Sequence, residues 1–216
     1  MERILEPELM DDPGQALAYA QADFAAENQT FVDLFRSRFP HFVKGRVLDL
    51  GCGPADIPIR FARALPDCQV TAVDGSPAMI RLSEEAVKTA GLEQRIALRC
   101  RRLQDLQVDE PADGIISNSL LHHIANPLQF WDGIKRCGKP GAVVLVMDLT
   151  RPRSTADAQA IVERYAVDAP PILRRDFYNS LLAAFTEDEV RMQLADRKST
   201  RLNSSHSQQS RMPSSA

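Results

Sequence analysis

The stretch RVLDLGCGPADIPIR, from Arg46 to Arg60, decides the fold of this 216-residue chain. Its residues 47–50 (VLDL) form a short, mainly apolar run, which predicts a buried parallel strand that leads into a turn. Gly51 and Gly53 permit positive φ and let a ligand approach the backbone closely. Asp56 is placed to cap the helix that follows. A strand, a glycine-rich turn and a helix N-terminus together predict a nucleotide-binding corner.

An acidic residue near the end of this strand indicates which ligand the corner takes. Asp49 lies two residues before Gly51, so the pattern is not the GxGxxG of dinucleotide-binding proteins. A carboxylate there repels a pyrophosphate and suits an ammonium group, which disfavours a nicotinamide-dependent dehydrogenase. The stretch resembles motif I of the class I S-adenosylmethionine-dependent methyltransferases, and the resemblance extends over residues 44–150.

Asp74 is the second residue that the pattern singles out. It ends an apolar run at residues 68–73, about 20 residues past the glycine turn, where a ribose-binding carboxylate is expected. The alternative role, capping the next helix, better suits Ser76, because Pro77 follows it. The resemblance implies that S-adenosylmethionine is bound by the following residues: Asp49, Gly51, Cys52, Gly53, Asp74, Gly75, Met79, Ser117 and Asn118.

The sequence leaves two contacts with adenine undecided. Met79 occupies the position where the family places a side chain against adenine, but it also fits the core. After the strand predicted at 95–100 the family commonly has an acidic residue that accepts from the adenine amino group. Here Arg101, Arg102 and Leu103 follow, and Asp105 is the nearest acid.

Residues 113–124 (DGIISNSLLHHI) resemble motif IV, in which the residues after the fourth strand line the mouth where methyl transfer occurs. The resemblance implies that backbone carbonyls near Ser117 and Asn118 accept from the methionine ammonium group. His122 and His123 are the candidate catalytic residues, as a general base or an acceptor contact, with hydrogen-bonded packing as the alternative. Because they are adjacent, we expect them not to converge on one ion as an i, i+4 pair would, and no metal is predicted.

Strands alternate with helices along the chain, which predicts βαβ units and a mostly parallel sheet in an α/β, Rossmann-like three-layer sandwich. Expected strands at 46–50, 68–73, 95–100, 113–117 and 139–149 are joined by helices that include 77–90 and 127–136. The family's sheet has the order 3-2-1-4-5-7-6, with strand seven antiparallel. Only five strands are evident up to residue 195, so strands six and seven are expected to be missing and strand five to form a sheet edge.

Composition changes divide the chain into three parts. Residues 1–43 are expected to form an N-terminal helical cap, in which Tyr19 and Phe24 could line the pocket. Residues 44–195 are expected to form the methyltransferase domain, incomplete at its C-terminus, with helices at 154–184, broken at residues 170–171, and at 186–194. Residues 196–216 (DRKSTRLNSSHSQQSRMPSSA) resemble a translated sequencing adapter, and we expect a non-native, disordered tail.

Composition and charge limit the classes of function that the chain can have. The chain carries a net charge of −3; residues 1–195 hold 22 basic and 28 acidic residues, a net of −6, which disfavours a nucleic-acid partner. No run of 18 apolar residues and no apolar leader occurs, so we expect a cytoplasmic protein without a membrane span. The expected activity is methyl transfer from S-adenosylmethionine to an unidentified, small-molecule acceptor. The alternative is a cofactor-binding but inactive module or truncated fragment, and the oligomeric state is left open.

Overall fold

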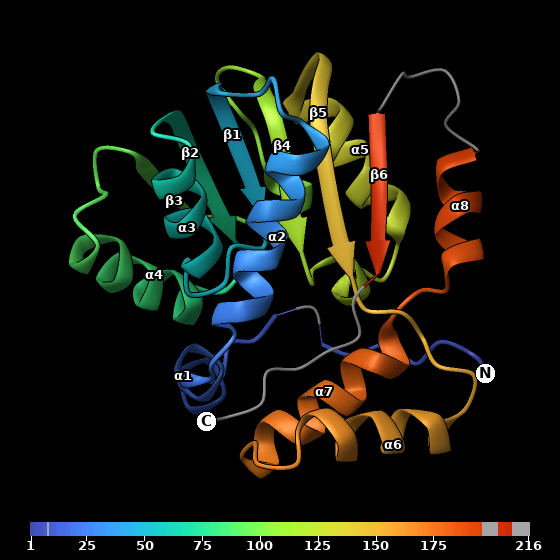
Figure 1. Cartoon of the computed structure of the whole chain (residues 1–216). Helices are drawn as coiled ribbons and strands as arrows, with labels where there is room; N and C mark the ends of the chain where they lie inside the picture. The colour runs from blue at the N-terminus through green and yellow to red at the C-terminus, as the bar shows by residue number, and fades with distance from the viewer. Residues whose placement is uncertain (8, 196–202, 209–216) are drawn as a thin grey trace.

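The computed structural model describes residues 1–7 and 9–195, and the backbone of residues 203–208. Its centre is a parallel sheet in the order β3-β2-β1-β4-β5-β6 (Figure 1). The strands are β1 (Lys44–Leu50), β2 (Asp67–Asp74), β3 (Ile96–Cys100), β4 (Ala112–Asn118), β5 (Gly138–Asp148) and β6 (Asn203–Gln208). The helices are α1 (Pro13–Gln21), α2 (Ala25–Arg38), α3 (Asp56–Ala64), α4 (Pro77–Thr89), α5 (Pro127–Cys137), α6 (Thr155–Tyr165), α7 (Pro171–Ala183) and α8 (Glu187–Ala195). The predicted Rossmann-like α/β sandwich is confirmed.

Alternating side chains of the strands build a core on each face of the sheet. Val47 of β1 belongs to a cluster that contains Phe35 of α2 and Phe61 of α3, all nearly inaccessible to solvent. Leu48, the next residue, belongs to the opposite cluster, which is formed with Trp131 of α5. Successive residues of a strand point to opposite faces, so a strand covered by helices on both sides is apolar throughout.

The five predicted strands, β1 to β5, are all present, but β5 is not the sheet edge that was expected, because β6 lies beyond it. It pairs with β5 in parallel, from Val143 opposite Asn203 to Asp148 opposite Gln208. The prediction rested on side-chain patterning, whereas a strand ladder needs only backbone N–H and C=O groups, which polar residues also provide. The described residues contain no antiparallel strand. The rest of the tail, 196–202 and 209–216, lies outside the described residues, and the adapter resemblance stays a prediction.

The helix starts follow the local sequence with one exception. Ser76 caps α4 by accepting from the Met79 N–H at 3.2 Å, as predicted. Asp56 does not cap α3: the cap position is taken by Ala55 at a φ of 71°, and no side chain accepts there. The Asp56 carboxylate instead accepts from Arg60 one turn later, at 2.7 Å. Ala55 is the third residue with positive φ in this segment, after Gly51 and Gly53.

Helices α1, α6 and α7 lie across the carboxyl ends of the strands (Figure 1). The N-terminal segment reaches the same edge, where the Arg3 guanidinium donates to the carbonyls of His122 and Ile124 at 2.7 and 3.0 Å. Segments from both ends of the described chain therefore enclose the edge at which parallel strands bind ligands. Within the described residues, no helix combines the length and the apolar character that crossing a membrane would require.

Candidate active site

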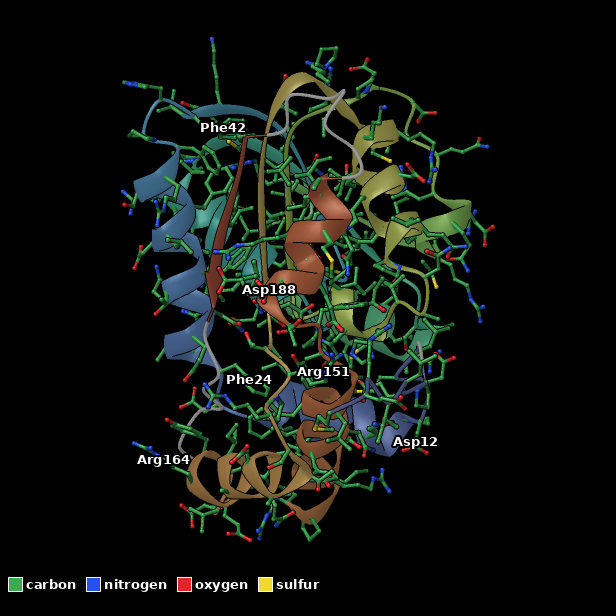
Figure 2. All side chains as sticks on the ribbon, turned by 90° about the vertical axis from the view of Figure 1, so that its right-hand side faces the viewer. Asp12, Phe24, Phe42, Arg151, Arg164 and Asp188 are labelled. Carbon is green, nitrogen blue, oxygen red and sulfur yellow. The ribbon has the colours of Figure 1, made fainter. Side chains whose placement is uncertain are left out.

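A cavity of about 200 Å³ lies at the carboxyl ends of β1, β2, β4 and β5. The strand order reverses between β1 and β4, and parallel α/β sheets bind ligands at such a switch point. Residues of α1, α2 and α7 close the cavity on the outside. Figure 2 shows Phe24 and Arg151 at the level between the strands and the helices α6 and α7. The fold thus places the cavity where the sequence predicted the ligand site.

The turn after β1 holds backbone against this cavity. Gly51 and Gly53 adopt φ angles of 76° and 51°, a region that glycine enters without steric cost. The N–H groups of Gly51 and Cys52 donate to the Val73 carbonyl at 2.8 and 3.0 Å, which ties the turn to β2. A Cβ on Gly51 would lie 3.0 Å from the Leu120 side chain. Glycine is therefore required there by both conformation and space.

Asp74 ends β2 with its carboxylate on the cavity wall. Its Oδ2 accepts from the Gly53 N–H at 2.9 Å, and its Oδ1 accepts from the Ser76 N–H at 2.8 Å. A carboxylate has about four acceptor sites, so each oxygen keeps one for a further donor. Burial raises the pKa of Asp74 in spite of these two hydrogen bonds. Two free acceptor sites on one held carboxylate fit the two hydroxyls of a ribose.

Asp49 is buried behind the same turn, with 2% of its surface exposed. Its Oδ2 has no hydrogen-bond partner among the described residues. Burial, and then the charge of Asp74, raise the pKa of Asp49 to about 8. A buried carboxylate without a partner is costly unless a cation neutralises it. Asp49 does not itself line the cavity, but its charge is placed to favour an ammonium group at the turn.

The other predicted cofactor residues separate into three groups. The cavity is lined by Gly51, Gly53, Asp74, Gly75, Met79 and Asn118. Cys52 lines an adjoining cavity of about 460 Å³ on the other side of the glycine turn. Ser117 is fully buried, and its hydroxyl donates to the Leu50 carbonyl at 2.8 Å. Its side chain therefore joins two strands and does not reach the cavity.

The segment after β3, where the resemblance implies contacts with adenine, brings no carboxylate to the cavity. Arg101, Arg102 and Leu103 line it, whereas Asp105 does not. The departure from the family pattern that the sequence indicated is therefore present in the structure as well. Met79, which is 4% exposed, both lines the cavity and packs with Ala16 of α1. The two roles considered for Met79 are thus compatible.

The outer wall of the cavity is apolar and aromatic. The rings of Tyr19 and Phe24 lie 4.9 Å apart and both line the cavity, as the sequence suggested. Leu173 and Phe177 of α7 form the part of the wall beyond β5. Burial raises the pKa of Tyr19 to about 12, so its hydroxyl stays neutral. Such a wall excludes water and offers flat apolar surface to an acceptor molecule.

The two histidines of the short turn after β4 lie side by side on the cavity wall. Their ring centroids are 4.2 Å apart, with 35° between the ring planes. His122 Nδ1 lies 2.5 Å from Asp148 Oδ1, and His122 Nε2 lies 3.3 Å from Glu6 Oε1. His123 Nδ1 lies 3.3 Å from the same Glu6 oxygen and 3.3 Å from the Pro7 carbonyl. Both rings therefore face the same Glu6 oxygen, and the expectation that these adjacent histidines do not converge on one point is wrong.

The pair has opposite protonation preferences. Burial disfavours a charged His122, but the adjacent Asp148 and Glu6 outweigh it and raise the pKa of His122. Burial and then the neighbouring His122 lower the pKa of His123 to about 3. Of the two rings, His122 is therefore the one that more readily takes up a proton.

Glu6 and Asp148 are functional candidates that the sequence reasoning missed. Asp148 carried a signal, because it ends the apolar run of β5 as Asp74 ends β2. Glu6 carried none, since it belongs to an acidic N-terminal segment without periodicity and lies 116 residues before His122. Only the folded chain shows that its carboxylate is buried against the histidine pair.

Comparison with known proteins places this geometry in context. A family model described as a methyltransferase domain matches residues 41–189. A demethylmenaquinone methyltransferase of Porphyromonas gingivalis is 30% identical over 115 residues, covering 52% of this chain and 47% of that protein. A carboxy-S-adenosyl-L-methionine synthase of Trichlorobacter lovleyi is 33% identical over 105 residues, covering 46% and 43%. The chain thus spans about half the length of the curated relatives it matches.

A solved structure extends the likeness to most of the chain. It is a putative S-adenosyl-L-methionine-dependent methyltransferase from Methanococcus maripaludis, with a TM-score of 0.69 and 16% identity. The match covers 92% of this chain and 88% of that one. At this identity the likeness establishes the fold.

Proposed function

Because the chain belongs to the methyltransferase-domain family, whose model matches residues 41–189, we propose that it transfers a methyl group from S-adenosylmethionine to a small molecule. The observation that carries the proposal is the held carboxylate of Asp74, with its two free acceptor sites, beside a glycine turn of positive φ. When bound, S-adenosylmethionine supplies an activated methyl group on a sulfonium sulfur, so the protein needs no nucleophile of its own.

The residues of this chain then have binding and orienting work to do. Asp74 accepts from the ribose hydroxyls, and the turn at Gly51 and Gly53 leaves room for the ligand against the backbone. The ammonium group of the methionine part favours the ionised form of Asp49, which then attracts it, and Met79 contacts the adenine. Each of these contacts acts on a different part of one extended ligand. Together they fix where the methyl group points.

The acceptor side of the cavity supports a small, partly apolar molecule. Tyr19, Phe24 and Phe177 give it flat apolar walls, and α7 closes it from outside. These walls limit the access of water to the acceptor side of the cavity. A nucleic-acid strand needs an open basic surface, whereas acidic side chains, including Asp176 and Glu27, line this cavity.

His122 and His123 are proposed to act on the acceptor, because both line the cavity next to the end of β5. An acceptor hydroxyl next to these two rings would contact polar groups of the protein. His122 is held by Asp148 and cannot turn toward the cavity without breaking a 2.5 Å contact. Its contribution is therefore positional, and His123, which is more exposed, is the ring that reaches the acceptor.

Binding and turnover are tested separately. Titration calorimetry with S-adenosylhomocysteine is expected to show one site per chain. Incubation with S-adenosylmethionine and a fractionated small-molecule extract is then expected to release S-adenosylhomocysteine in one or a few fractions. Absence of binding would refute the cofactor assignment. Binding without turnover in any fraction would favour the alternative, a cofactor-binding module that is inactive by itself.

A further inference from the structure

We propose that Glu6, His122 and His123 form a binding site for one divalent transition-metal ion, Zn²⁺ being the ion that the ligand set fits best. One ligand atom from each residue lies within 4.8 Å of the other two. A carboxylate and two imidazoles are the ligand set of many zinc sites that keep a position open for a substrate. The inference goes beyond cofactor binding, and it rests on the proposed function only for what the ion does to an acceptor.

The spacing of these atoms fits a metal ion better than it fits hydrogen bonds. Two ligands held tetrahedrally at about 2.05 Å from one ion are roughly 3.3 Å apart. Glu6 Oε1 lies 3.3 Å from His122 Nε2 and 3.3 Å from His123 Nδ1. Yet this buried oxygen has no hydrogen-bond partner among the described residues. Neither ring nitrogen thus makes a hydrogen bond to this oxygen, and the hydrogen-bond partner of His123 Nδ1 is the Pro7 carbonyl.

The groups behind the ligands also match a metal site. A metal-binding histidine almost always donates its second ring N–H to a carboxylate or carbonyl, which fixes its tautomer. His122 Nδ1 lies 2.5 Å from Asp148 Oδ1, so its Nε2 is left as the free nitrogen that faces Glu6. Asp148 is itself held, because it accepts from the backbone N–H groups of His122 and Leu149 at 3.1 and 2.6 Å.

Charged groups surround the proposed ligand atoms. Glu6 and Asp148 are two largely buried carboxylates, and the nearby guanidinium of Arg3 is engaged with backbone carbonyls. A metal ion bound here would place positive charge beside both carboxylates and contact both rings at once. The Pro7 carbonyl accepts from His123 Nδ1 at 3.3 Å, and a metal ion on this nitrogen would replace that hydrogen bond.

An ion at this position would act on the acceptor. His122 and His123 line the cavity and Glu6 does not, so the proposed ion lies at the margin of the space next to the methyl-donor site. There it would bind an oxygen of the acceptor and lower the pKa of a hydroxyl group. The hydroxyl proton would pass to solvent, and the oxygen lone pair would be free to attack. The acceptor class that fits is an alcohol, an enol or a phenol with its oxygen on the metal.

Metal binding is measured on the untagged chain, because a histidine tag would bind the same ions. The chain, stripped with a chelator, is titrated with Zn²⁺ and, separately, with Co²⁺ in the absence of any cofactor. One ion per chain is expected, and the cobalt form should show the intense visible absorption of a four-coordinate site. Failure to bind either ion stoichiometrically would overturn the inference and leave the methyl-donor proposal intact.

Matched variants locate the ion. Glu6→Gln and His123→Asn each remove a ligand and should weaken Zn²⁺ binding by more than about 100-fold. Asp148→Asn removes the group behind His122 and should weaken binding by about 10–100-fold. His41→Asn and Glu84→Gln change exposed residues of the same types and should have no effect. Binding of S-adenosylhomocysteine by each variant shows that it is folded. Equal Zn²⁺ affinity of Glu6→Gln and Glu84→Gln would overturn the site.

Discussion

Replacing Asp74 by alanine tests the cofactor site most directly. The Asp74 carboxylate is held by the N–H groups of Gly53 and Ser76 and has one acceptor site left on each oxygen. Hydrogen bonds to a charged group contribute about 1.5–3 kcal/mol each. Loss of one ribose contact should therefore raise the Kd for S-adenosylhomocysteine roughly tenfold, and loss of both should raise it about 100-fold or more.

The same substitution also affects the fold, so binding and stability must be separated. Two backbone donors lose their acceptor, which should lower the free energy of unfolding by about 1–3 kcal/mol. Calorimetry is therefore done at a temperature where circular dichroism shows the variant to be folded. Asp67→Ala is the control, because Asp67 is an exposed residue at the opposite end of the same strand. This variant should bind like the unmodified chain.

A double-mutant cycle with the ligand identifies the contact. An S-adenosylhomocysteine analogue that lacks one ribose hydroxyl should bind the unmodified chain about tenfold more weakly. Asp74→Ala should bind the two ligands almost equally, because the partner of that hydroxyl is already gone. An unchanged Kd for Asp74→Ala, or an undiminished penalty for the missing hydroxyl, would refute the assignment of Asp74 as the ribose ligand.

Three further predictions concern Asp49, Gly51 and Ser117, which lie at or near the glycine turn. Asp49 has a folded-state pKa of about 8, above its unfolded value, so the ligand-free chain should lose on the order of 1 kcal/mol of stability per pH unit from pH 5 to 8. Urea unfolding should show Asp49→Asn without most of this loss, and an equal slope would contradict it. Gly51→Val should abolish cofactor binding and lower the melting temperature, because its φ is 76° and Leu120 occupies the space; calorimetric binding of normal strength would argue against this. Ser117→Ala should cost about 1–2 kcal/mol of unfolding free energy, by leaving the Leu50 carbonyl without its donor, while the calorimetric Kd for S-adenosylhomocysteine stays the same.

Local sequence rules predicted the first five strands and the helices well, because those rules describe short stretches. The run before Asp49 had to be a buried strand, and Ser76 with Pro77 had to start a helix. Asp56 shows the limit of such rules, since the left-handed backbone at Ala55 moved the helix start by one residue. Which residues cap a helix depends on the conformation in which the preceding turn leaves the chain.

Contacts between distant segments could not be predicted in this way. Glu6 meets the histidine pair only because the N-terminal segment crosses the carboxyl ends of the strands, and no pattern in MERILEPELM indicates that path. The pairing of β6 with β5 is a second case, since its register depends on backbone groups and not on side-chain pattern. The side chain of Ser117 is a third, since no local pattern indicates its hydrogen bond to the Leu50 carbonyl of β1; the predicted role of the backbone carbonyl near Ser117 stays a prediction.

The carboxyl edge of the sheet departs from the rules that hold elsewhere in this protein. β2, β4 and β5 end in Asp74, Asn118 and Asp148, and β1 carries Asp49 one residue before its end. Asp49 and Asp74 are close enough that the charge of one raises the pKa of the other. Such crowding of buried carboxylates lowers the stability of the ligand-free fold. A bound cation or a set of hydrogen-bond donors removes this electrostatic destabilisation. Ligand binding at the edge is therefore more favourable than it would be without the crowded carboxylates. The residues that weaken the fold alone are therefore the ones from which its function is best inferred.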